Sequence, residues 1–232
     1  MLQGINISNI LFLDIETAPV VYRYDALQPE MQKMWDAKWK YNTEQSPEQH
    51  YIKAGIYAEF AKVICISVGT VKDNTFRVKS FYGDDEKQLL LAFRELLLKH
   101  YNTPQHLLCA HNGKEFDFPF ICRRMLINGI TLPKILDIAG KKPWEINHVD
   151  TLEFWKFGDY KSFTSLNLLA AVFHIPTPKD DIDGSQVARV YWEDKDLPRI
   201  VTYCQKDVLT VAQLILRFCN QPLIEDKNVI IA

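Results

Sequence analysis

Long hydrophobic runs are missing from this sequence of 232 residues, in which no segment is apolar, uncharged and long enough to span a bilayer. Its first ten residues, MLQGINISNI, contain no basic residue and no small-residue cleavage site after an apolar run, so we expect neither a secretory signal nor a transit peptide. These absences predict a soluble, cytoplasmic protein with no membrane partner.

Paired cysteines and an excess of positive charge are also missing. The cysteines number five, an odd count, and form no C-x-x-C pair, which indicates reduced core thiols rather than zinc ligands or disulfides. Lys and Arg total 27 against 29 Asp and Glu, a formal net charge of −2, so the sequence excludes nucleic-acid binding through a general basic field. A nuclease is still compatible with this charge, because bound divalent ions can neutralise phosphates beside a cut site.

The elements that are present alternate between strands and helices. Hydrophobic residues make up 47% of the chain and charged residues 24%, as in ordinary globular proteins, and the length fits one domain covering residues 1–232 with an insertion. Apolar periodicity predicts strands around 10–15, 63–71, 75–82, 106–111 and 148–154, and helices around 84–101, 119–129, 165–173 and 197–219. This order predicts an α/β fold in which a mixed five-stranded sheet, with one antiparallel strand, has helices on both faces.

The insertion covers about residues 19–62, which are polar, rich in aromatic residues and without strand periodicity. Its tyrosines and tryptophans alternate with lysines and could stack nucleobases. Met31, Trp35 and Trp39 nevertheless recur every four residues, and we favour the alternative that they pack a helix onto the core.

Five side chains stand where three predicted elements would carry them to one edge of the sheet. Asp14 and Glu16 alternate on the first strand, so both point to the same face, roughly 6.6 Å apart along it. Asp117 lies where a loop enters a helix, and Tyr203 and Asp207 are four apart on the last helix and share a face. Each acid alone could be a solvated residue or a helix cap, so the prediction depends on their combination.

The three segments carrying these residues, 13–17, 112–119 and 203–207, resemble the exonuclease motifs of the DEDD superfamily, also called DnaQ-like, whose fold is ribonuclease H-like. They are most similar to those of the proofreading domain of family-B DNA polymerases, over about residues 10–219. The histidine branch of the superfamily carries His at the position of Thr202, so Tyr203 indicates the tyrosine branch, DEDDy.

This resemblance implies a metal-dependent 3′-5′ exonuclease that acts on single-stranded 3′ ends, on DNA rather than RNA, in a repair or proofreading role. Four carboxylates without a Cys or His beside them suit two Mg²⁺ or Mn²⁺ ions, which Asp14, Glu16, Asp117 and Asp207 would bind. Tyr203 would position the attacking water, because a phenol is a poor base at neutral pH. The substrate-binding residues that we expect in the matched motifs are Thr17, Asn112 and Phe116.

Two alternatives remain open at this point. The chain could be an exoribonuclease that trims RNA, or a nucleic-acid-binding module that keeps the fold without turnover. Proofreading would require a separate polymerase or repair partner. We interpret Asp150 as a strand residue that binds no metal.

Overall fold

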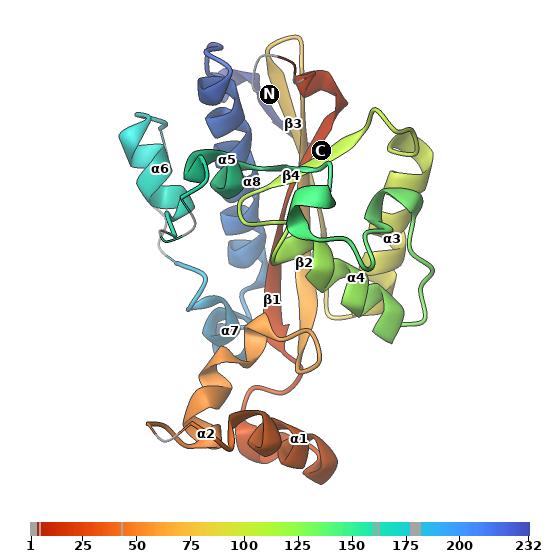
Figure 1. Cartoon of the computed structure of the whole chain (residues 1–232), viewed down its shortest axis with the longest axis vertical. Coiled ribbons are helices and arrows are strands. Elements are labelled where there is room, and N and C mark those ends of the chain that lie inside the picture. The colour runs from red at the N-terminus through yellow and green to blue at the C-terminus, as the bar shows by residue number, and fades with distance from the viewer. Residues whose placement is uncertain (1–3, 5, 43, 160, 162, 177–181) are drawn as a thin grey trace.

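A six-stranded sheet forms the centre of the protein, in the order β5-β4-β1-β2-β3-β6 (Figure 1). The computed structural model describes residues 4, 6–42, 44–159, 161, 163–176 and 182–232. Its strands are β1 (Ile10–Pro19), β2 (Ala61–Lys72), β3 (Thr75–Tyr82), β4 (Leu107–Ala110), β5 (Val149–Asp150) and β6 (Val229–Ile231). β2 is antiparallel to both of its neighbours and every other adjacent pair is parallel, so the predicted mixed sheet with one antiparallel strand is confirmed.

Helices cover both faces of the sheet, as predicted. The α-helices are α1 (Pro29–Trp39), α2 (Pro47–His50), α3 (Glu86–His100), α4 (Asp117–Ile127), α5 (Thr151–Lys156), α6 (Leu166–Val172), α7 (Val187–Arg189) and α8 (Leu197–Phe218). Short 3-10 helices are η2 (Ile7–Asn9), η3 (Tyr24–Ala26), η4 (Tyr51–Ile56), η5 (Lys134–Leu136), η6 (Pro143–Glu145) and η8 (Asp226–Asn228), while η7 (Val190–Asp194) is a π-helix. Figure 1 shows α3 and α4 on one side of the strands and α8 on the other. Within the described ranges, no helix is both long enough and apolar enough to cross a membrane.

The alternation of β1 assigns its side chains to two cores. Leu11, Leu13 and Ile15 are buried in the core that α3 and α4 cover. Ile10 and Phe12 are buried in the second core, together with the inner face of α8. Because successive side chains of a strand point to opposite faces, Asp14 follows Phe12 onto the side of α8.

The strands β2 and β3 form a hairpin whose turn has the backbone conformation that the sequence requires. Asp73 and Asn74 both have positive φ, at 48° and 60°, which is the geometry of a type I′ turn. Asp and Asn tolerate this left-handed conformation better than other residues with a side chain. A two-residue turn therefore joins the strands that the sequence predicts around 63–71 and 75–82.

The insertion between β1 and β2 folds around its own aromatic cluster, beyond the ends of the two strands (Figure 1). Trp35 is completely buried there against Tyr51 and Phe60, and its indole N–H donates to the carbonyl of Pro47 at 2.7 Å. The predicted helix through Trp35 and Trp39 is confirmed as α1, but it packs on this separate cluster and not on the core of the sheet.

Two predictions about the sheet were wrong in detail. The strand expected around 148–154 ends after Asp150, because the Asp150 carboxylate accepts the N–H groups of Leu152 and Glu153 and so caps α5. The sheet also has a sixth strand, β6, which pairs with β3 and which the sequence does not predict. Three residues on an edge strand provide no usable periodicity.

Candidate active site

The predicted metal-binding residues of β1 lie where this strand loses its neighbour. The last β1 residue paired with β4 is Phe12, opposite Cys109, so in the described part of the chain the following residues have no sheet partner on that side. The N–H of Ile15 donates instead to the carboxylate of Asp117. Asp14 and Glu16, on either side of Ile15, therefore lie next to Asp117 although a hundred residues separate them in the sequence.

Asp117 stands in the first turn of α4 and is 3% exposed. The loop before it is tight: Asn112 is left-handed, with φ of 61°, and a Cβ on Gly113 would lie 2.4 Å from the Cβ of Ala110. Only glycine fits at such a close approach. The local sequence therefore determines how the chain turns from β4 into α4 and brings Asp117 to β1.

Helix α8 brings the third motif to the same face. It lies over β1 and β2, and its apolar stripe, which includes Val208 and Val211, is buried against the sheet. Tyr203 and Asp207 lie one turn apart, and the phenol of Tyr203 is hydrogen-bonded to the carboxylate of Asp207. Between them Cys204 is fully buried, and its thiol donates to the carbonyl of Asp14 at 3.4 Å.

The four acids interact electrostatically. Burial raises the pKa of Asp14 well above its ordinary value, and the charges of Asp207 and Asp117 raise it further. Burial likewise raises the pKa of Glu16, with an additional effect from the charge of Asp14. For Asp117 burial raises the pKa from 3.8 to about 8, although hydrogen bonds from backbone N–H groups oppose the shift. Burial and mutual repulsion disfavour the ionised form of these carboxyl groups, and a bound cation would offset both effects.

The donor atoms fit a divalent cation. Asp14 Oδ2 is a buried oxygen with no hydrogen-bond partner among the described residues, which is rare for a polar atom unless a ligand serves it. Ligand atoms of Asp14, Glu16 and Cys204 lie within 4.8 Å of one another. Asp117 and Asp207 are outside this group of three and act on Asp14 through their charge.

A thiol beside the carboxylates corrects our expectation of a site without cysteine. Burial raises the pKa of Cys204 well above its ordinary value, so the sulfur keeps its proton and its hydrogen bond to Asp14. A metal ligand would have to be the thiolate. The oxygen atoms thus remain the suitable donors, and oxygen ligands favour Mg²⁺ or Mn²⁺ over zinc.

The three predicted substrate-binding residues all have contacts within the protein. The hydroxyl of Thr17 donates to the carbonyl of Gly55 at 2.7 Å and so ties β1 to the insertion. Phe116 packs partly buried against Phe120, with ring centroids 5.4 Å apart. Asn112 donates its backbone N–H to Asp150.

Asp150 is the residue whose importance the sequence does not reveal. Its carboxylate is 2% exposed and accepts four backbone N–H groups, from Asn112, Lys114, Leu152 and Glu153. The first two belong to the loop that leads to Asp117, so Asp150 fixes that loop to β5 and α5. An ion pair of 2.5 Å between Lys114 and Glu153 adds a second connection.

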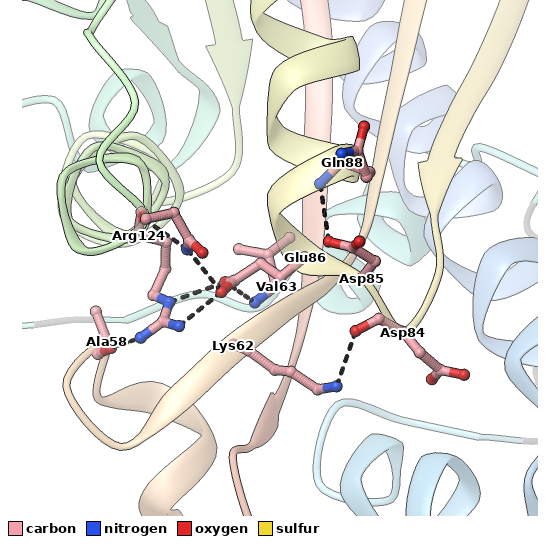
Figure 2. Close-up of polar contacts among 9 residues, drawn as sticks. Ala58, Lys62, Val63, Asp84, Asp85, Glu86, Gln88 and Arg124 are labelled. Carbon is pink, nitrogen blue, oxygen red and sulfur yellow. Dashed lines mark hydrogen bonds and ion pairs between the residues drawn. The ribbon is translucent and has the colours of Figure 1, made fainter.

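A buried ion pair anchors the other side of α4. Glu86, at the start of α3, pairs with Arg124 of α4 at 2.6 Å, and both side chains are 8% exposed (Figure 2). Glu86 also accepts the N–H of Val63, while Arg124 donates to the carbonyl of Ala58. The helix that carries Asp117 is therefore fixed to α3 and to the start of β2.

One protein family matches most of the chain. Residues 55–223 match a family described as predicted 3′-5′ exonuclease related to the exonuclease domain of PolB. The matched range contains Asp117, Tyr203 and Asp207 but begins after Asp14 and Glu16. No curated protein matches the chain in sequence.

One solved structure with a similar fold is the family B DNA polymerase from the hyperthermophilic archaeon Pyrobaculum calidifontis. The TM-score is 0.53 at 16% sequence identity, over 90% of this chain and 24% of the polymerase chain. The likeness at this identity concerns the fold, and this chain spans about a quarter of the polymerase.

Proposed function

The chain belongs to the family of predicted 3′-5′ exonucleases related to the exonuclease domain of PolB, and on that premise we propose that it hydrolyses single-stranded DNA from the 3′ end. The observation that carries the proposal is the convergence of Asp14, Glu16 and Asp117 beside the middle of β1, with Asp207 close enough to raise the pKa of Asp14. Buried carboxylates that repel one another are costly, and their cost is offset when they bind cations.

We assign the binding of two Mg²⁺ or Mn²⁺ ions to these four carboxylates. When bound, such ions would supply an activated water and stabilise the leaving oxygen in phosphodiester hydrolysis. The charges of Asp207 and Asp117 are the largest electrostatic effects on Asp14, so Asp14 would be suited to hold both ions. Glu16 and Asp117 would complete the coordination from β1 and α4, and Asp207 from α8.

Tyr203 acts in this proposal as a hydrogen-bond donor and not as a base. Burial raises the pKa of its phenol far above the ordinary value of 10, and the charges of Asp207 and Glu16 raise it further. The hydroxyl therefore keeps its proton at any physiological pH. It can orient a water or a phosphate oxygen beside Asp207 but cannot remove a proton from one.

The decisive experiment measures release of mononucleotides from a 5′-labelled single strand in the presence of Mg²⁺ or Mn²⁺. We expect stepwise shortening from the 3′ end, no shortening when the 3′ terminus is blocked, and slower digestion of duplex DNA and of RNA. Asp14→Ala should abolish the activity, and Asp226→Ala, which removes an exposed acid of η8, should leave it unchanged. Full metal-dependent activity in Asp14→Ala would refute the assignment of the site.

A further inference from the structure

A cavity lies next to Pro19 at the end of β1, between the start of β2 and the turn that leads into α8. It has a volume of about 390 Å³ and is lined by Lys62, Asp84, Tyr191, Trp192, Lys195 and Leu197. These residues come from three separate segments of the chain, so the cavity exists only in the folded protein.

Two lysines share one indole ring at this cavity. The Nζ atom of Lys195 lies 4.8 Å from the ring centroid of Trp192, and that of Lys62 lies 5.8 Å from it. Lys62 is half-buried, and burial lowers its pKa, as does the charge of Lys195. A chain of net charge −2 thus brings two ammonium groups together at a cost.

The charges of Asp84 and Glu86 act on Lys62 from nearby and raise its pKa. Among the described residues, neither Lys62 nor Lys195 forms an ion pair. Lys62 donates to the backbone carbonyl of Asp84 at 3.3 Å (Figure 2), while the Asp84 carboxylate accepts the hydroxyl of Tyr191 at 2.5 Å. Glu86 forms its ion pair with Arg124 (Figure 2). Two ammonium groups and one carboxylate therefore line the cavity, which leaves its lining with an excess of one positive charge.

The backbone around Trp192 is unusual. It belongs to the π-helix η7, which is followed by Lys195 in a left-handed conformation with φ of 56°. Single π-helical turns and left-handed residues other than glycine occur preferentially at functional sites, because the rest of the fold must compensate for them. Here the turn is held by a hydrogen bond of 3.0 Å from the Trp192 indole to the carbonyl of Pro19.

Pro19 connects the cavity to the carboxylates. It is the last residue of β1 and stands three positions after Glu16 on the same strand, a separation of roughly 10 Å. A polymer whose 3′ end lies at the carboxylates and which continues along β1 would therefore reach Trp192 within a few nucleotides. Lysines beside an aromatic face are a typical combination for holding single-stranded nucleic acid.

We infer that the cavity between Lys62, Trp192 and Lys195 binds one backbone phosphate of the single-stranded substrate, a few nucleotides before its 3′ end. The inference rests on the proposed function for the identity of the polymer. The two ammonium groups bind the phosphate and the indole of Trp192 holds them in place. The site would thus contribute to affinity for long strands and not to the chemical step.

The test measures the binding of fluorescein-labelled oligothymidylate, twelve nucleotides long, by anisotropy at increasing NaCl concentration. Mg²⁺ is present, and the last linkage is a phosphorothioate that resists hydrolysis. Neutralising one phosphate contributes about 0.7 to the slope of log affinity against log salt for a single strand. The double variant Lys62→Met/Lys195→Met should lose about 0.7 of this slope, and Lys62→Arg/Lys195→Arg should keep it.

The matched control is Lys72→Met/Lys99→Met, which removes the same charge at exposed positions at the end of β2 and in the last turn of α3. Equal slopes in the two methionine variants, or no binding by the wild-type protein, would overturn the inference. The same variants also separate it from the proposed function. Cleavage of a dinucleotide should be unchanged in Lys62→Met/Lys195→Met while kcat/KM for the twelve-nucleotide strand falls several-fold. A wild-type protein that binds strands without cutting them would refute the nuclease and leave the phosphate site intact.

Discussion

Replacing Asp150 with asparagine tests whether its hydrogen bonds hold the loop that leads to Asp117 in place. In the wild-type protein Oδ1 accepts the N–H groups of Asn112, Leu152 and Glu153, while Oδ2 accepts that of Lys114. An asparagine can place its single oxygen at the Oδ1 position and keep three of these bonds. Its NH₂ group then faces the N–H of Lys114, where two donors meet and no bond forms.

The magnitude follows from this single lost contact. A hydrogen bond to a charged group contributes about 1.5–3 kcal/mol, and the N–H of Lys114 is buried and would find no water to replace it. We expect Asp150→Asn to lower the free energy of unfolding by about 2–3 kcal/mol. Asp150→Ala should cost more, because it leaves the buried N–H groups of Lys114 and Leu152 without acceptors.

The consequence for activity is a displaced Asp117. Misplacing a reacting group by about 1 Å can reduce a rate about a hundredfold, so we expect kcat of Asp150→Asn to fall about 10-fold to 100-fold with KM nearly unchanged. The Mg²⁺ concentration for half-maximal activity should rise, an effect that a loss of stability alone would not produce.

Urea unfolding and a Mg²⁺ titration of exonuclease activity, both well below the melting temperature, measure the two effects. Asp85→Asn is the control, because it changes an exposed carboxylate that caps α3, where asparagine caps nearly as well. Unchanged stability in Asp150→Asn would refute the hydrogen-bond argument. Reduced stability with unchanged kcat and Mg²⁺ dependence would refute the positioning role.

Three further predictions follow from the buried charges. Burial raises the pKa of the Asp117 carboxyl from 3.8 to about 8, so between these pH values the folded metal-free protein binds more protons than the unfolded chain. The melting temperature of the metal-free protein should therefore fall as pH rises from about 4 to 8, and Mg²⁺ or the substitution Asp117→Asn should weaken this trend. A melting temperature that rises with pH in the absence of metal would contradict the prediction. Tyr203→Phe should slow cleavage about tenfold and leave the Mn²⁺ affinity measured by calorimetry unchanged. A loss of Mn²⁺ affinity would instead show that the phenol is part of the metal site. Glu86→Gln should lower the free energy of unfolding, measured in urea, by about 3–5 kcal/mol, because it leaves the buried charge of Arg124 unpaired. A decrease of less than about 1 kcal/mol would mean that water reaches the ion pair.

The parts of the fold that the sequence predicts are those with strong periodicity. β3 and α8 begin at the predicted residues because their apolar positions repeat at strand and helix spacing. The apolar residues after Asp150 look equally suited to a strand, and only the side-chain bonds of Asp150 turn them into α5. The periodicity of apolar residues does not reveal such a helix cap, and it does not reveal a short edge strand such as β6.

The candidate site divides in the same way. The grouping of Asp14, Glu16 and Asp117 could be predicted, since strand alternation and strand ends determine where side chains meet. The neighbouring thiol of Cys204 and the bonds from Asp150 to the Asp117 loop could not, because each depends on contacts between distant segments. The bond between Asp150 and Asn112, for example, spans 38 residues.

The way in which the insertion joins the sheet suggests how such enzymes could diversify. Pro19 and Ala61 face each other as an antiparallel pair, so residues 20–60 leave and rejoin the hairpin at adjacent points. Closing a longer or shorter segment across that gap changes the entropy of the chain only slowly with length. Evolution could therefore replace the entire insertion with a short turn, or with a different segment, while Glu16 stays paired with Cys65. The choice of substrate would then change at the end of β1, while Asp14 and Glu16 on the same strand keep the chemistry unchanged.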